Sequence, residues 1–147
     1  MSTNIDNITA GIDNQIWKSD SDKWNGIKSL NTRGYKALPT RRVLIPKKNG
    51  KMRPLSIPTI KDRAMQTLYL LSLQPIEETV ADEHSYGFRL NRSCQDACEQ
   101  IFADLSLKES AQWVLEGDIK GCFDNISHDW MLKNIPMDKN VLNQFIK

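Results

Sequence analysis

Residues 40–57 constrain the fold more than any other part of the sequence. They read TRRVLIPKKNGKMRPLSI, in which two β-prone runs are joined by Asn49 and Gly50, a pair that suits a type I′ hairpin turn. Proline has no amide hydrogen to donate to a ladder, so Pro46 and Pro54 require these strands to lie at a sheet edge or to end early. The sequence therefore predicts a basic β-hairpin at the protein surface.

Helix signals stand on both sides of the hairpin. Thr59 with Asp62, and Ser93 with Asp96, resemble capping boxes and mark two helix starts, and Pro136 separates two further short helices. Apolar residues then recur at helical spacing. The predicted helices cover residues 18–31, 59–78, 93–106, 127–134 and 138–146, and the second of them is expected to be long and buried.

A further strand is predicted at 112–119, where a short apolar run ends in an acidic tip that presents Asp118. With the hairpin and the helices, this strand makes the fold class α+β. The 147 residues suffice for one domain with a hydrophobic core. The chain has neither a stretch long and apolar enough to span a membrane nor a secretory leader, which predicts a cytoplasmic protein.

Three cysteines are expected to be reduced thiols. Cys94 and Cys98 stand four residues apart on a predicted helix, and the third is Cys122. For the first two, a role as buried small hydrophobic residues is favoured over a metal site, since no histidine or paired cysteine motif stands at ligand spacing.

The positive charge is concentrated in one segment. The chain has a formal net charge of +2, but residues 33–63 alone carry ten Lys or Arg against Asp62, a net +9. Residues 1–32 carry −1 and residues 64–147 carry −6. A basic block of this kind is typical of phosphate binding, because each neutralised phosphate releases condensed counterions. A solvated cationic surface explains the charge equally well.

Asp118 is the first candidate for chemistry. A carboxylate at a strand end, followed by a turn with Gly121 and by Phe123, suits metal-assisted phosphoryl transfer, in which Mg²⁺ ions bind carboxylate and carbonyl oxygens. One carboxylate is not enough for two such ions. Taken alone, an aspartate in this position is more often a cap or a turn residue.

The hairpin and the loop at 84–93 supply two further candidates. Lys47 and Arg53 flank the turn on opposite strands and can converge on a polyphosphate, although an edge strand kept soluble by its charges is the commoner explanation. In the loop, Tyr86 and Phe88 alternate with arginines, which suits base stacking and phosphate binding. Each aromatic can equally anchor the loop in the core.

Three strings in order resemble successive early motifs of bacterial group II intron-encoded reverse transcriptases (maturases): RRVLIPKKNGKMRPLSIPTIKDRAMQ, SYGFR and EGDIKGCFDNISHD. A weaker string, TAGID, resembles the motif that precedes the fingers of these enzymes. The resemblance implies a reverse-transcriptase fingers region with a partial palm. It divides the chain into an N-terminal extension with a helix at 1–34, fingers at 35–110 and the start of a truncated palm at 111–147.

The resemblance also implies roles for individual residues. Asp118 matches the first catalytic aspartate, which binds Mg²⁺ together with the carbonyl of Ile119. Phe123 matches the bulky residue that excludes a 2′-hydroxyl, and Lys47 and Arg53 match residues that bind the incoming dNTP. Residues implied in binding the RNA template or RNA/DNA hybrid are Arg41, Arg42, Lys48, Lys61, Arg63, Arg89 and Arg92.

Two departures from the family pattern bear on these roles. Leu90 and Asn91 replace the usual Pro-Gly, which predicts a different loop geometry around Arg92. The Tyr-X-Asp-Asp motif with the remaining catalytic carboxylates is absent from these residues. We therefore expect a fragment that binds RNA weakly, including intron RNA, but does not polymerise alone, and that self-associates through the exposed edge of the strand at 112–119. A non-catalytic RNA-binding module and an interaction partner of a full-length reverse transcriptase remain alternatives.

Overall fold

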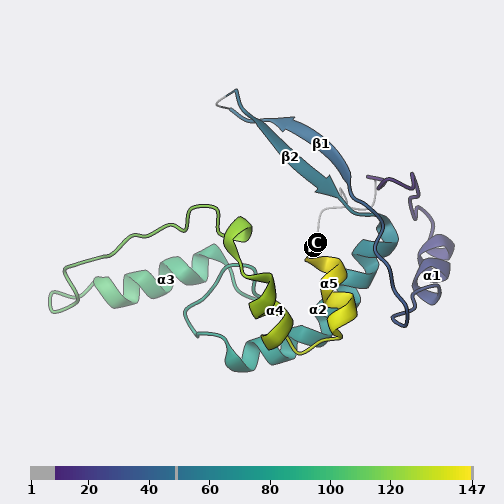
Figure 1. Cartoon of the computed structure of the whole chain (residues 1–147). Coiled ribbons are helices and arrows are strands. Elements are labelled where there is room, and N and C mark those ends of the chain that lie inside the picture. Colours follow the sequence, from purple (N-terminus) through teal and green to yellow (C-terminus); the bar gives the residue numbers. More distant parts are fainter. Residues whose placement is uncertain (1–8, 49, 147) are drawn as a thin grey trace. The chain divides into compact units, whose positions relative to one another are not determined.

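The computed structural model describes residues 9–48 and 50–146, and Figure 1 shows their path. The fold is α+β, as predicted: helices accompany one two-stranded antiparallel sheet within the described residues. The elements in chain order are α1 (Asp20–Lys28), β1 (Arg41–Pro46), β2 (Met52–Ile57), α2 (Ile60–Val80), α3 (Cys94–Leu105), the 3-10 turn η1 (Phe123–Asn125), α4 (His128–Asn134) and α5 (Lys139–Phe145).

The chain forms two compact units, each described by itself. Unit 1 contains the residues up to Gln74 together with those from His128 onward, and unit 2 is Pro75–Ser127. The division falls inside α2, at Pro75.

The hairpin of β1 and β2 confirms the predicted strands. Pro54 faces Leu44 and Pro46 faces Met52, and both prolines are tolerated because each strand of a two-stranded sheet is an edge. The amide of Lys47 donates to the carbonyl of Lys51, and the amide of Gly50 donates back to Lys47. Gly50 has φ +77°, the left-handed conformation that glycine adopts without strain. The predicted type I′ turn also involves Asn49, which lies outside the described residues.

The start of α2 is a buried polar junction. Thr59 accepts a hydrogen bond from the amide of Asp62, as the capping pattern predicts, and its hydroxyl donates back to the carboxylate at 2.7 Å. The same carboxylate accepts from the Tyr35 hydroxyl at 2.6 Å and from the Leu38 amide at 3.3 Å. Asp62 therefore ties the segment before the hairpin to the helix after it.

The hydrophobic core lies in unit 1. Its buried apolar side chains are Ile57, Ile60, Met65, Val141 and Leu142. The ring of Phe145 on α5 makes edge contacts with Tyr35 and Tyr69, with centroids 5.9 Å apart in each pair, and Figure 1 shows α5 beside α2. Helix α2 runs longer than predicted and is buried only in its first turns, because Leu70, Leu71 and other apolar residues farther along it are exposed.

Helix α1 is shorter than the predicted 18–31. A capping box between Ser19 and Asp22 starts it, and Ser29 caps its end. A Cβ atom on Gly26 would stand 2.3 Å from the ring of Trp17, so glycine at this position lets the indole lie directly on the helix backbone.

In unit 2, two expectations are wrong. Residues 112–119 are irregular rather than a strand, because within the described residues no second strand pairs with them, and a strand needs such a neighbour for its backbone hydrogen bonds. The edge on which self-association was predicted is therefore not formed. Cys94, Cys98 and Cys122 are free, as expected, but Cys94 and Cys98 are exposed rather than buried, since α3 has no buried residue. Helix α3 itself begins at the predicted capping box of Ser93 and Asp96.

Over the described ranges, no helix combines the length and apolarity that crossing a lipid bilayer requires.

Candidate nucleotide and nucleic-acid interface

The register of the hairpin decides which of its basic residues share a face. Arg53 pairs with Ile45, and the backbone of Lys47 bonds to that of Lys51 one step nearer the turn. Because alternate residues of a strand point to the same side, Lys47 and Arg53 lie diagonally on one face, within reach of a common anion. Both residues are exposed, and neither forms an ion pair among the described residues.

The other predicted RNA-binding residues of unit 1 are distributed differently. Arg41 and Arg42 are neighbours in β1 and therefore point to opposite faces; Arg41 belongs to the face of Lys47 and Arg53 and is half-buried, whereas Arg42 is exposed. Lys48 is exposed in the turn. In the first turn of α2, Lys61 is exposed, whereas the guanidinium of Arg63 is partly buried and donates to the carbonyl of Thr9. The sequence did not indicate which of these basic side chains are exposed and which are partly buried.

The residues matched to the polymerase centre lie in an exposed segment of unit 2. The Asp118 side chain and the Ile119 backbone belong to the irregular stretch, and Phe123 opens η1 with its side chain 78% exposed. The turn between them is held by Asn125, whose side-chain amide donates to the carbonyl of Gly121 at 2.8 Å. Gly121 has φ +60°, a left-handed conformation that glycine adopts without strain. Asn125 is a residue that the sequence reasoning missed.

The donor set around Asp118 does not by itself fit Mg²⁺. Among the described residues no three His, Cys, Asp or Glu side chains gather at one point. Mg²⁺ demands near-octahedral oxygen coordination, of which Asp118 and one carbonyl supply a part.

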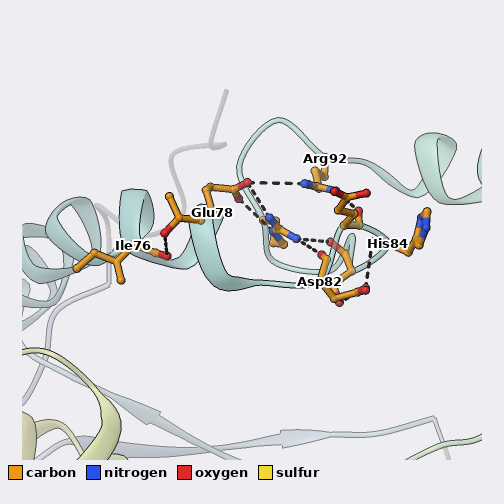
Figure 2. Close-up of polar contacts among 9 residues, drawn as sticks. Ile76, Glu78, Asp82, His84 and Arg92 are labelled. Atoms are coloured by element: carbon orange, nitrogen blue, oxygen red, sulfur yellow. Dashed lines mark hydrogen bonds and ion pairs between the residues drawn. The ribbon is translucent and has the colours of Figure 1, made fainter.

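The loop between α2 and α3 is built around a buried arginine, Arg89. Figure 2 labels Glu78, Asp82 and Arg92 among the polar contacts of this loop. Arg89 donates to both carboxylate oxygens of Glu78, at 3.0 and 2.7 Å, and its remaining nitrogen donates to the carbonyls of Asp82 and Ser85. Its side chain is only 3% exposed. This pairing lowers the pKa of the Glu78 carboxyl, mainly through the hydrogen bond from Arg89. Arg89 thus holds the loop to the end of α2 rather than presenting its charge to solvent.

Arg92 belongs to the same group of contacts, and Arg89, Arg92 and Glu78 together form what we call the clamp of this loop. Its guanidinium lies over the Tyr86 ring, 5.9 Å from the centroid, donates to the Glu83 carbonyl and stands 3.7 Å from Glu78. Asn91, where the family usually has glycine, has φ +57°. Asparagine tolerates this left-handed conformation better than most residues, so the departure from Pro-Gly is accommodated by the backbone.

The two aromatics of the loop differ. Tyr86 is half-buried under Arg92, whereas Phe88 has φ +61° and a relative exposure of 101%, so it does not anchor the loop in a core. The structure thus brings Lys47 and Arg53 together in unit 1, and Arg89 and Arg92 together in unit 2. Asp118, Ile119 and Phe123 also belong to unit 2.

Comparison with known proteins decides the family. The family model for reverse transcriptase (RNA-dependent DNA polymerase) matches residues 45–140, which include the hairpin turn, the 82–92 loop and the segment of Asp118. The chain belongs to the reverse transcriptase family. This confirms the resemblance inferred from the three motif strings, and it accounts for their order along the chain.

Among curated proteins this reverse transcriptase chain is similar to several whose names state that an intron encodes them, and to one whose name does not. It is 47% identical over 103 residues to the group II intron-encoded protein LtrA of Lactococcus lactis subsp. cremoris, an overlap of 69% of this chain and 17% of that protein. It is 41% identical to protein YkfC of Escherichia coli over 69% of this chain and 27% of that one. A putative COX1/OXI3 intron 2 protein of Saccharomyces cerevisiae is 34% identical over 82% of this chain and 13% of its own length. The chain therefore spans well under a third of these relatives.

Proposed function

We propose that this chain contributes the nucleotide-binding and template-binding part of an RNA-directed DNA polymerase of the group II intron type. Lys47 and Arg53 bind the triphosphate of the incoming dNTP, and Phe123 excludes a 2′-hydroxyl at the sugar. Asp118 and the Ile119 carbonyl supply part of the donor set for Mg²⁺. Template RNA, RNA/DNA hybrid and intron RNA are bound by the basic residues of the fingers at 35–110, chiefly Arg41, Arg42, Lys48 and Lys61.

The observation that carries this proposal is the shared face of Lys47 and Arg53. A planar guanidinium and a compact ammonium on one exposed face form the donor pair that a polyphosphate requires. The concentration of positive charge in unit 1 supports binding of a longer phosphate chain, because counterion release makes such binding favourable at low salt.

A pair of matched variants tests the hairpin. Arg53→Ala removes a charge from the face of Lys47, and Arg42→Ala removes the same charge from the opposite face of the neighbouring strand. Titration with a fluorescent deoxynucleoside triphosphate should show weaker binding for Arg53→Ala alone. If the two variants lose affinity equally, binding follows net charge and not the shared face.

RNA binding is tested by its salt dependence. For a short single-stranded RNA, we expect the logarithm of the affinity to fall linearly with the logarithm of salt concentration, with a slope that decreases by about one for each lost phosphate contact. Arg42→Ala and Lys61→Ala should each reduce the slope in this way. A wild-type chain without measurable RNA affinity at low salt would contradict the proposal.

We also propose that the chain does not polymerise alone, because Asp118 does not belong to a group of three or more potential metal ligands among the described residues. In a primer-extension assay with Mg²⁺ and dNTPs we expect no product. Product that Asp118→Ala abolishes would refute this expectation.

A second candidate function is an interaction module that binds a full-length reverse transcriptase or another copy of itself. The 112–119 segment favours it, because Trp113 is 94% and Leu115 is 97% exposed and the backbone lacks strand partners within the described residues. Light scattering at increasing protein concentration tests binding to a second copy, which a strict monomer excludes.

A further inference from the structure

Phe88 combines two features that rarely occur together. It is the most exposed of the large hydrophobic side chains in the described residues, at 101%, and its backbone is left-handed, with φ +61°. The first feature forgoes the hydrophobic gain of burying a phenylalanine. The second is disfavoured for every bulky residue, because Cβ crowds the following carbonyl. Neither feature helps the loop to fold.

The surrounding loop holds Phe88 in this conformation. The next residue, Arg89, is buried and bound to Glu78 and two carbonyls, and Tyr86 on the other side lies against Arg92. The irregular 112–119 segment also exposes apolar side chains, but no comparable set of side-chain hydrogen bonds is found along it in the described structure. Phe88 is thus displayed by an ordered clamp. Strain at a residue that its surroundings fix in place is characteristic of functional sites.

We propose that Phe88 is a stacking platform for one unpaired base of the bound RNA. An exposed ring offers a flat apolar face, and every base has a matching one, whereas in a duplex both faces of a base are covered by its neighbours. Arg92, held over Tyr86, places a guanidinium in the same loop, where it can add a cation–π contact to the face of the base. This inference rests on the proposed RNA binding and adds to it the residue and the mode of contact.

Charge favours stacking over phosphate contacts at this position. Unit 2 carries four Lys or Arg against eleven Asp or Glu, a formal −7, so it repels a phosphate backbone. A base stacked on Phe88 makes a contact without ion pairing. The contribution of Phe88 to RNA affinity is therefore nearly independent of salt, in contrast to that of the hairpin.

The test uses the full chain and a single-stranded oligoadenylate of about ten nucleotides that carries 2-aminopurine, whose fluorescence is quenched on stacking. Phe88→Ala should weaken binding by about 5- to 100-fold and remove the quenching, with an unchanged salt slope. Phe88→Trp should retain both affinity and quenching. Phe102→Ala, an exposed phenylalanine of the same unit on α3, is the matched control and should leave both unchanged.

A glycine variant separates binding from folding. Phe88→Gly removes the Cβ that disfavours φ +61°, so it should protect the loop at least as well as the wild type against hydrogen exchange while binding RNA as weakly as Phe88→Ala. The stacking role of Phe88 is overturned if Phe88→Ala leaves RNA binding unchanged, or if Phe102→Ala weakens it equally. Either result leaves the proposed function intact. If Phe88→Ala abolishes self-association and leaves RNA binding unchanged, Phe88 belongs to a protein contact, and the proposed stacking role is overturned. A wild-type chain that binds no RNA overturns both proposals.

Discussion

The two units of this chain are held together by different forces. Unit 1 buries five apolar side chains among its described residues, and its sequence carries sixteen Lys or Arg against seven Asp or Glu, a formal +9. Unit 2, all of which the structure describes, has one buried residue, Arg89, and a formal −7. Hydrophobic burial can stabilise the first unit. The second depends on hydrogen bonds and on the ion pairs that Arg89 and Arg92 form with Glu78, so its order should be more local and more sensitive to pH.

The strongest test of this contrast is a cavity in unit 1. Met65 is fully buried in α2, and Met65→Ala should lower the free energy of unfolding of unit 1 by about 2–5 kcal/mol in urea denaturation. Leu71→Ala on the same helix is the control, because Leu71 is 63% exposed and its loss should change stability by less than about 0.5 kcal/mol. Equal losses would mean that the exposed side of α2 is also packed.

The polar junction at Asp62 gives a smaller effect. Tyr35→Phe removes the hydroxyl that donates to the buried carboxylate and should cost about 1–3 kcal/mol of unfolding free energy. Tyr86→Phe in unit 2 keeps the ring under Arg92 and should change stability little.

The same tyrosine predicts a response to alkali. Burial, and then the neighbouring Asp62, raises the pKa of Tyr35 above its usual value. A raised folded-state pKa contributes stability that is fully present below the unfolded value of about 10 and is lost as pH rises through the folded pKa. The free energy of unfolding of wild-type unit 1 should therefore fall as the pH rises above about 10. The variant Tyr35→Phe has no phenol at this position and should not show this loss of stability. If its stability falls with alkali as steeply as that of the wild type, Tyr35 is not the group responsible.

The smallest effect, a change in local stability with pH, should be confined to the loop between α2 and α3. Because Arg89 lowers the pKa of Glu78, the clamp contributes stability above the unfolded carboxyl value of about 4.3 and loses it as pH falls through the folded pKa. Glu78→Gln should speed amide exchange in the loop at neutral pH and flatten its acid dependence. Glu99→Gln on α3 is the control. Faster exchange in unit 1 as well would contradict the local character of the clamp.

Local signals predicted the regular elements well. The strands at 40–57 and the capping pairs Thr59 with Asp62 and Ser93 with Asp96 depend on residues close in sequence, and their elements formed with ends shifted by a few residues. The strand at 112–119 failed for the opposite reason. Its apolar pattern is local, but a strand is defined by a partner that its own residues cannot supply.

The candidate site could be predicted only in part. The shared face of Lys47 and Arg53 follows from a hairpin register that the sequence already indicated. The commitment of Arg89 to Glu78 and the exposure of Phe88 depend on how an irregular loop closes, and no periodicity encodes this. Asp62 likewise appeared to be only a helix cap, because its bond to Tyr35 joins residues that are 27 positions apart.

The discontinuity of unit 1 has a consequence for synthesis on the ribosome. Val141 and Leu142, two of the buried apolar side chains of unit 1, and Phe145, whose ring meets Tyr35 and Tyr69, are translated after every residue of unit 2. Helix α2 therefore emerges before the apolar residues of α5 that belong to the same unit. During that interval the nascent chain is exposed to aggregation and to chaperones.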